Sequence, residues 1–422
     1  MPTTHIVGAG MAGLAAAVKL TAAGRKVVLY DSATHAGGRC RSFHDSTLDR
    51  IIDNGNHLLL SGNKAVFQYL NTIGTADSLV GPEEPAFHFC DVRSGERWCV
   101  RPNLGLFPWW VFRRNRRVPG SSWLDYFSAL RLRHANQETT VTEILDPNGP
   151  LYEKYWQPLA VSVLNTPAEK AAACLLWPVV QETFGRGGRA SRPMIAKSGL
   201  SDSFVEPALA YLKKNNADIA FTARLRDVEL SADQSIVTGL NFADRKLTLE
   251  ESDNVILALP APVTGDVLEG ISPPVEHNPI VNVHFRLETE IQSKSDINFL
   301  GVIGGTAEWL FLRGDIVSVT VSAAEKLAEK SAAEIIDLTW GDIALALDLG
   351  DSTPPKARVV KEKRATFAQT PESLKYRAKT DTATNNLKLA GDWTDTGVPA
   401  TIEGAIRSGN AAARAVLRDT RA

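Results

Sequence analysis

Near its start the chain reads Ile6-Val7-Gly8-Ala9-Gly10-Met11-Ala12-Gly13, a short apolar run followed by a glycine-rich turn. Residues 14–22 are rich in Ala and Leu and predict a helix, and residues 26–30 predict a second strand that ends at Asp31. A GxGxxG turn between a strand and a helix, with an acid after the next strand, is the context in which this motif binds a dinucleotide. The sequence therefore predicts an α/β fold with a nucleotide-binding domain.

Each position in this unit has a physical role toward a bound dinucleotide. Gly8 permits the tight turn, Gly10 lets a pyrophosphate approach the backbone, and Gly13 lets the helix pack closely on the strand. The free N–H groups at the start of the helix then hold the phosphates. Asp31 can accept hydrogen bonds from both hydroxyl groups of an adenosine ribose. The alternative is a tight turn that binds no ligand. It would explain the glycines but not the presence of Asp31 at the end of the second strand.

Two further segments favour FAD over NAD. Gly37-Gly38-Arg39 follows the acid within eight residues, and residues 53–57 read Asp-Asn-Gly-Asn-His. A flavoprotein needs such a return of the chain past the pyrophosphate and along the flavin ring, whereas an NAD dehydrogenase does not. Near the other end, a predicted strand at 387–389 leads to Asp392, and a helix is predicted to begin at 401–409. The strand-end carboxylate can bind ribityl hydroxyls, and the helix N-terminus can stabilise the negative charge of reduced flavin.

Composition excludes several classes of protein. The chain has 422 residues, which exceeds the size of about 250–300 residues at which a single core stops growing, so two domains are expected. Lys and Arg number 46 against 48 Asp and Glu, and this balance argues against a general nucleic-acid binder. The four cysteines form no CxxC pair and no HExxH spacing occurs, so we expect no metal site and reduced thiols in a cytoplasmic protein. We find no secretory signal and no apolar run of about 18 residues, so no membrane span is expected.

The flavin motifs lie at both ends of the chain, so the predicted Rossmann-like FAD-binding domain is discontinuous. We expect a second domain that binds substrate, built from a mixed sheet and helices, because residues 281–286 and 315–321 alternate like half-buried strands. The predicted boundaries are 1–75, 197–260 and 385–422 for the FAD-binding domain, and 76–196 and 261–384 for the substrate domain.

Residues 104–112 are apolar without interruption, and Arg113, Arg114, Arg116 and Arg117 come directly after them. Such a run is too short to span about 30 Å of hydrocarbon, but it can enter the interface of a bilayer. Trp109 and Trp110 would then lie at headgroup depth, with the arginines on anionic lipid. We therefore expect Leu104–Arg117 to dock on the inner face of the cytoplasmic membrane. The alternative is a buried core segment beside a solvated basic loop.

Several motifs carry a resemblance to a known family. The chain resembles the FAD-dependent amine oxidase and phytoene desaturase superfamily in GAGMAGLAAA at 8–17, GGR at 37–39, LAGDW at 389–393 and TIEGAIRSG at 401–409. It resembles more closely the squalene-associated FAD oxidoreductases, the group of the hydroxysqualene dehydroxylases, in DNGNHLL at 53–59, FVEPAL at 204–209, VILALP at 255–260 and residues 391–409. Asp31 stands where many superfamily members carry Glu, and either carboxylate can serve the ribose.

The resemblance implies an activity, a cofactor and partners. The implied reaction is the reductive dehydroxylation of hydroxysqualene to squalene, in which hydride from reduced FAD replaces the hydroxyl group. The implied partners are a hydrophobic isoprenoid substrate and the enzymes upstream in squalene synthesis, and a backbone group near Val228 would meet the adenine. The residues assigned to FAD are Gly8, Gly10, Met11, Ala12, Gly13, Asp31, Ser32, Gly38, Arg39, Asn56, Val228, Gly391, Asp392, Thr401 and Ile402.

His57 is the leading candidate for a catalytic residue, because an imidazolium can donate a proton near neutral pH. A histidine that hydrogen-bonds to the flavin or packs structurally is the alternative, and Asp53 and Glu403 are weaker candidates. A carotenoid or phytoene-type desaturase, with hydride moving from lipid to flavin, is the nearest rival function, and an amine oxidase is a more remote one. A prenyl-lipid carrier of the same fold that has lost its flavin is a third, which the intact FAD motifs oppose.

Overall fold

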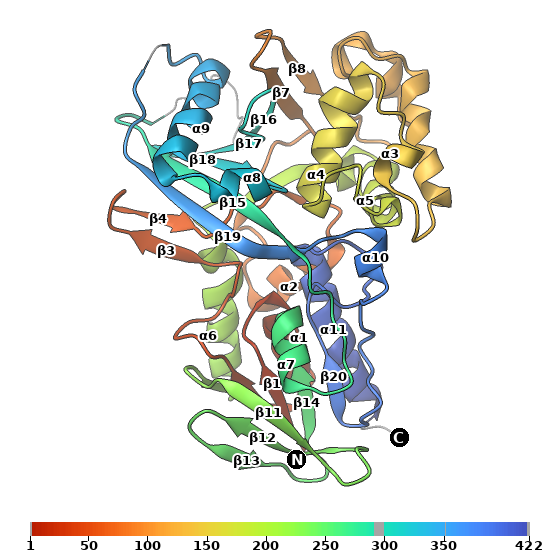
Figure 1. Cartoon of the computed structure of the whole chain (residues 1–422), viewed down its shortest axis with the longest axis vertical. Helices are drawn as coiled ribbons and strands as arrows, with labels where there is room; N and C mark the ends of the chain where they lie inside the picture. The colour runs from red at the N-terminus through yellow and green to blue at the C-terminus, as the bar shows by residue number, and fades with distance from the viewer. Residues whose placement is uncertain (1, 291–298, 351, 420–422) are drawn as a thin grey trace.

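The computed structural model describes residues 2–290, 299–350 and 352–419 (Figure 1). Figure 1 shows a lower and an upper part of the molecule, which follow one another along its long axis. The lower part contains both ends of the chain, and the upper part contains an extended antiparallel sheet with helices on either side of it. No helix in the described ranges combines the length and the apolar character needed to cross a bilayer.

A parallel sheet forms the core of the lower part, in the order β10-β2-β1-β14-β20. Its strands are β1 (Thr3–Val7), β2 (Lys26–Tyr30), β10 (Asp218–Ala220), β14 (Asn254–Leu257) and β20 (Leu387–Leu389). The helices α1 (Met11–Ala22), α2 (Lys64–Ile73), α6 (Glu206–Lys214) and α11 (Ile402–Asp419) lie around it. Both faces of a parallel sheet are covered, and most residues of the central strands are accordingly buried. The α/β class predicted from the sequence is confirmed, and the domain boundaries stay a prediction.

The first and last helices of this sheet pack unusually closely. A Cβ atom placed on Gly409 of α11 would lie 2.0 Å from the carbonyl oxygen of Ala12 in α1. A Cβ atom on Gly13 would lie 1.8 Å from the carbonyl oxygen of Gly8. Glycine at both positions is therefore a condition for the contact of α1 with α11 and with the preceding turn.

The upper sheet has the order β19-β15-β18-β17-β16-β7-β8, and all of its pairings are antiparallel except that of β7 with β16. Its strands are β7 (Phe87–Asp91), β8 (Arg97–Val100), β15 (His277–Arg286), β16 (Phe299–Ile303), β17 (Trp309–Arg313), β18 (Ile316–Val321) and β19 (Ala357–Phe367). One face buries valines of β15 and β18 under α8 (Glu325–Glu329) and α9 (Ala332–Ala346). The other face therefore borders the rest of the molecule.

That other face carries an aromatic cluster that includes Phe89, Trp98, Tyr155, Phe299 and Trp309. Helices α3 (Val141–Ile144), α4 (Gln157–Leu164) and α5 (Leu176–Glu182) lie over the cluster. The remaining strands and α-helices of the described residues are β3 (Ser42–Asp45), β4 (Arg50–Asp53), β5 (Leu59–Leu60), β6 (Leu79–Val80), β9 (Pro193–Ala196), β11 (Leu225–Leu230), β12 (Val237–Phe242), β13 (Lys246–Thr248), α7 (Ala261–Val267) and α10 (Pro371–Leu374).

Candidate active site

The glycine-rich turn between β1 and α1 leaves room for an anion. Gly8 has a φ of +108°, and its N–H donates to the carbonyl oxygen of Tyr30 at 2.7 Å. Gly10 is the N-cap of α1, and no side chain caps this helix. A Cβ atom on Gly10 would meet no atom within 4 Å. The first N–H groups of α1, from Met11 and Ala12, thus border open space, which is the arrangement that binds phosphate at a helix N-terminus.

The carboxylate of Asp31 is held directly beside this turn. Its Oδ2 accepts from the N–H of Ala9 at 2.6 Å, and its Oδ1 accepts from the N–H of Ala33 at 2.8 Å, with the exposed Ser32 between. Each carboxylate oxygen retains a lone pair that a ribose hydroxyl can use. Val228 is buried in β11, whose partner strand β12 packs against β2 through a ring contact of Phe242 with Tyr30. This smaller sheet therefore lies against the same parallel sheet.

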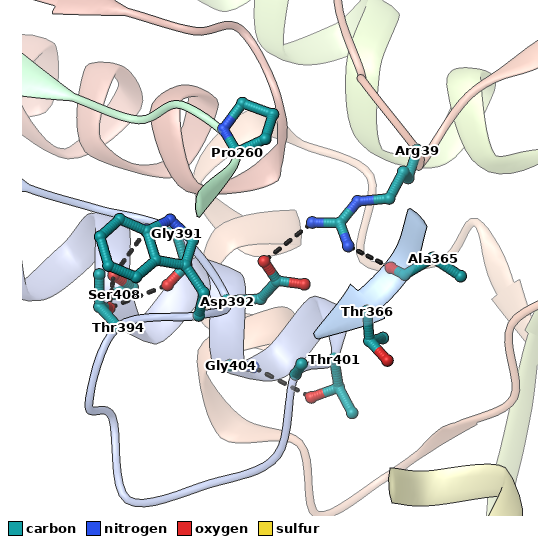
Figure 2. A network of polar contacts seen from close by, with 12 residues as sticks. Arg39, Pro260, Ala365, Thr366, Gly391, Asp392, Thr394, Thr401, Gly404 and Ser408 are labelled. Carbon is teal, nitrogen blue, oxygen red and sulfur yellow. Dashed lines mark hydrogen bonds and ion pairs between the residues drawn. The ribbon is translucent and has the colours of Figure 1, made fainter. Parts of the chain in front are cut away.

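Figure 2 shows how Arg39 links three distant segments of the chain. Its Nη2 donates to Oδ1 of Asp392 at 2.8 Å, and its Nη1 donates to the carbonyl oxygen of Ala365 in β19. The Arg39 side chain is nevertheless 42% exposed, and Gly38 before it is exposed as well. A guanidinium that is fixed by an ion pair and still faces open space can present its free edge to a phosphate or to ring oxygens.

The loop that carries Asp392 is fixed by its own backbone and by α11. Gly391 has a φ of +151°, and its N–H donates to Oγ of Ser408 at 2.9 Å. At the start of α11, Oγ1 of Thr401 accepts from the N–H of Gly404 at 3.1 Å, and Ile402 is the first helical residue (Figure 2). The structure thus places the strand-end carboxylate and a helix N-terminus at the same end of the parallel sheet.

Glu403 and Asp53, the weaker catalytic candidates, are occupied by structural contacts. The two carboxylate oxygens of Glu403 accept from the N–H groups of Ala65 and Val66, so this residue caps α2. Asp53 is buried, accepts from Oγ of Ser42 at 2.6 Å and pairs with Arg313 at 2.7 Å.

The segment after Asp53 crosses the face of the upper sheet. Asn56 Nδ2 donates to Oγ1 of Thr320 at 3.1 Å, and it also lies 3.5 Å from Oδ1 of Asn282. Burial lowers the pKa of His57 to about 4, although Asp53 acts in the opposite direction. The ring is therefore neutral near pH 7, whereas the sequence analysis expected an imidazolium, and the catalytic role of His57 stays a prediction.

A cavity of about 420 Å³ adjoins His57. Its buried lining includes His284 and Ser318 of the upper sheet, and its exposed lining includes His44 and Asp49 of the β3–β4 hairpin. This volume lies within the range of small-molecule sites in proteins. Sequence reasoning missed the cavity because its walls come from segments far apart in the chain, with no common motif.

An exposed apolar patch lies in the upper part of the molecule. Its nine side chains are 40–73% exposed and belong to Leu104, Leu106, Phe107, Trp109, Phe112, Trp123, Leu124, Phe127 and Leu130. Arg116 lies over the ring of Trp109, 4.9 Å from its centroid. Trp110 is buried against Tyr126, so its expected position at headgroup depth is wrong. A short 3-10 turn over Trp109–Phe112 directs these neighbouring side chains to different sides. The patch also includes side chains from residues 123–130, beyond the expected docking segment Leu104–Arg117.

A family model described as flavin containing amine oxidoreductase matches residues 11–417. The chain belongs to this family. This flavoprotein is 43% identical over 417 residues to the hydroxysqualene dehydroxylase of Zymomonas mobilis subsp. mobilis, and the match covers 99% of both chains. It is 24% identical over 478 residues to a probable zeta-carotene desaturase of Synechococcus elongatus, with 98% of both chains covered.

Among solved structures, the flavoprotein is similar to cyclohexylamine oxidase from Brevibacterium oxydans IH-35A. The TM-score is 0.72 with 14% sequence identity over the full length of both chains, which shows a common fold. The predicted fold class, the FAD cofactor, the oxidoreductase activity and the resemblance to hydroxysqualene dehydroxylases are confirmed. The roles of the individual site residues stay predictions.

Proposed function

We propose that this flavoprotein catalyses the reductive dehydroxylation of hydroxysqualene to squalene. The observation that carries the proposal is the 43% identity to a hydroxysqualene dehydroxylase over 99% of both chains. The desaturase relative is much more distant, at 24% identity. Phe311 and Ile195 line the cavity that adjoins His57 and suit an unsaturated hydrocarbon chain, and an aromatic face stabilises positive charge as the C–O bond lengthens.

The residues of the site fit FAD. The uncapped start of α1 and the open space at Gly10 would hold the pyrophosphate, and Asp31 would bind the ribose. Asp392 would bind the ribityl chain, and the N-terminus of α11 at Ile402 would stabilise negative charge at the flavin ring. Reduced FAD, as FADH2, would supply both the hydride that takes the place of the hydroxyl group and the proton with which that group leaves as water.

His57 would donate a hydrogen bond to the oxygen of the departing hydroxyl group. A neutral imidazole has one N–H donor, and neither ring nitrogen of His57 hydrogen-bonds to another residue in the described parts of the chain. The ring lines the cavity together with Asn56. A donor held in a buried site, aimed at an atom that gains negative charge, acts mainly on the transition state.

The test of the proposed function is a single turnover without oxygen. Enzyme with prereduced FAD is mixed with hydroxysqualene, and the products are followed by mass spectrometry while flavin absorbance is recorded. We expect squalene to form as the flavin is oxidised, in equal amounts. Flavin that stays reduced with no squalene formed contradicts the proposal. Bleaching of oxidised enzyme by squalene or phytoene would instead indicate a desaturase.

We also propose that the apolar patch docks on the inner face of the cytoplasmic membrane. Large apolar side chains on the surface of a soluble protein favour a partner that removes them from water. The arginines at 113, 114, 116 and 117 lie beside the patch and suit anionic headgroups, each contributing about 1 kcal/mol near such a surface. A docked enzyme would take its water-insoluble substrate from the bilayer in which upstream enzymes release it.

The variant Phe107→Ser/Phe112→Ser tests the docking. Both rings are about half exposed or more, so insertion of each contributes about 1 kcal/mol, and their loss should weaken vesicle binding roughly 30-fold. Binding is measured by co-sedimentation with phosphatidylcholine vesicles, with and without phosphatidylglycerol. Leu345→Ser is the matched control, because Leu345 is equally exposed but lies on α9. Equal binding by the double variant and the control would contradict the docking surface.

A further inference from the structure

Four polar residues form opposite pairs on the neighbouring strands β15 and β18 of the upper sheet. The register places Asn282 of β15 opposite Thr320 of β18, and His284 opposite Ser318. The hydroxyl of Thr320 donates to Oδ1 of Asn282 at 2.8 Å, and Nδ1 of His284 lies 2.7 Å from Oγ of Ser318. All four side chains are between 1% and 8% exposed. We call this group the polar square.

The polar square is unusual for its surroundings. The alternate residues of the same strands, Val281, Val283, Val317 and Val319, form the apolar face under α8 and α9. Polar groups in such a position lower stability unless their hydrogen bonds are complete, and apolar residues of similar shape would serve the sheet equally well. Nε2 of His284 is buried without a partner in the described parts of the chain. The square thus has hydrogen-bonding capacity that the fold itself does not use.

One donor of the square, Nδ2 of Asn282, lies beside Gly55. A Cβ atom on Gly55 would lie 3.3 Å from Nδ2 of Asn282 and 3.9 Å from Nε2 of His57, so both nitrogens border the same small space. Asn282 uses Nδ2 only for a long contact of 3.4 Å to the carbonyl oxygen of Asn54. Ser318 lines the adjoining cavity and has lone pairs that can accept a hydrogen bond.

A hydroxyl group can accept two hydrogen bonds and donate one. The space beside Gly55 borders the nitrogens of Asn282 and His57, and the cavity that His57 also lines has an acceptor at Ser318, so the two regions together complement a hydroxyl group and not a hydrocarbon. Phe311 and Ile195 contribute apolar surface to this cavity, which suits a hydrocarbon chain, and Arg50, Arg313 and Asp315 contribute charged groups to its wall.

We infer that the polar square, with His57, binds the hydroxyl group of the substrate and selects the alcohol over a hydrocarbon of the same skeleton. This inference rests on the proposed function. It gives a physical reason for product release, because squalene lacks the hydroxyl and leaves buried polar groups unpaired.

The test is equilibrium binding to the enzyme with oxidised FAD, which has no hydride to give and cannot turn the alcohol over. Hydroxysqualene and squalene are titrated in the same detergent, and the change in flavin absorbance gives each Kd. We expect the wild type to prefer the alcohol about 10–100-fold, the effect of one or two buried hydrogen bonds. Asn282→Leu, Thr320→Val and Ser318→Ala should each lower this preference about tenfold and leave squalene affinity unchanged.

Ser322→Ala is the matched control, because it removes a hydroxyl two residues beyond Thr320, outside the square. This control should keep the wild-type preference. If Asn282→Leu does not fold, Thr320→Val remains informative, because it replaces one hydroxyl by a methyl group of similar size. Wild-type preference in all square variants, or equal binding of both lipids by the wild type, overturns the inference. Failure of the proposed function is a different result: no squalene from prereduced wild type, whatever the binding ratios.

Discussion

Gly10→Val should give a folded protein that is isolated without flavin. Gly10 has φ −72° and ψ −178°, which is extended backbone that valine adopts readily, and a Cβ atom there meets nothing within 4 Å. The added side chain would instead stand in front of the N–H groups at the start of α1. Loss of about two charge-assisted hydrogen bonds to phosphate should weaken FAD binding about 100-fold or more.

The ratio of flavin to protein absorbance measures the loss, and the melting temperature of the FAD-free protein checks the fold. Gly341→Val is the control, because a Cβ atom on Gly341 in α9 also meets nothing within 4 Å and the site lies outside the nucleotide region. Gly13→Ala should behave differently and lose stability even without FAD, because its Cβ collides with the carbonyl oxygen of Gly8. Wild-type FAD affinity in Gly10→Val would show that the pyrophosphate lies elsewhere.

His57→Ala should keep its yellow colour and slow dehydroxylation on the order of 100-fold. The loss corresponds to one hydrogen-bond donor aimed at developing negative charge. Single-turnover oxidation of prereduced flavin by hydroxysqualene measures the rate. His57→Asn keeps an N–H donor near the same position and should recover part of the rate, whereas recovery by His57→Leu would point to packing alone. An unchanged rate in His57→Ala removes the residue from the mechanism.

The pH profile distinguishes a neutral donor from an imidazolium. Because burial lowers the pKa of His57 to about 4, the ring stays neutral and the His57-dependent rate should be constant between about pH 6 and 8. With an imidazolium as the donor, the rate would instead fall as the pH rises through the ordinary pKa of histidine.

The lowered pKa of His57 also affects stability. The contribution of this residue to the free energy of unfolding should be complete above about pH 6.5 and should fall as the pH drops from there toward 4, because only the unfolded ring then gains a proton.

Local spacing is what made the nucleotide region predictable. One strand–turn–helix–strand unit contains Gly8, Gly10, Gly13 and Asp31, so their spacing along the chain was enough to predict their relative positions. The predicted strands at 26–30 and 387–389 match β2 and β20 of the structure. The roles of these residues toward FAD remain to be tested by variants such as Gly10→Val.

The polar square shows why the rest could not be predicted. Asn282 and Thr320 are neighbours only through the register of β15 with β18, and a single sequence carries no signal for which strands pair. Trp109 and Trp110 show the same limit on a smaller scale. They are adjacent and chemically identical, and only the turn that contains them determines that one is exposed and the other is buried.

The packing of α11 on α1 through Gly409 has a consequence for biosynthesis. During synthesis β1, α1 and β2 leave the ribosome first, and β20 and α11 follow only after several hundred further residues. The nascent chain therefore contains the glycine-rich turn and α1 long before it contains α11, which packs on α1. Until α11 has been made, the side of α1 that it covers is exposed, and we expect chaperones to bind there. We therefore expect FAD to bind only after the whole chain has been made.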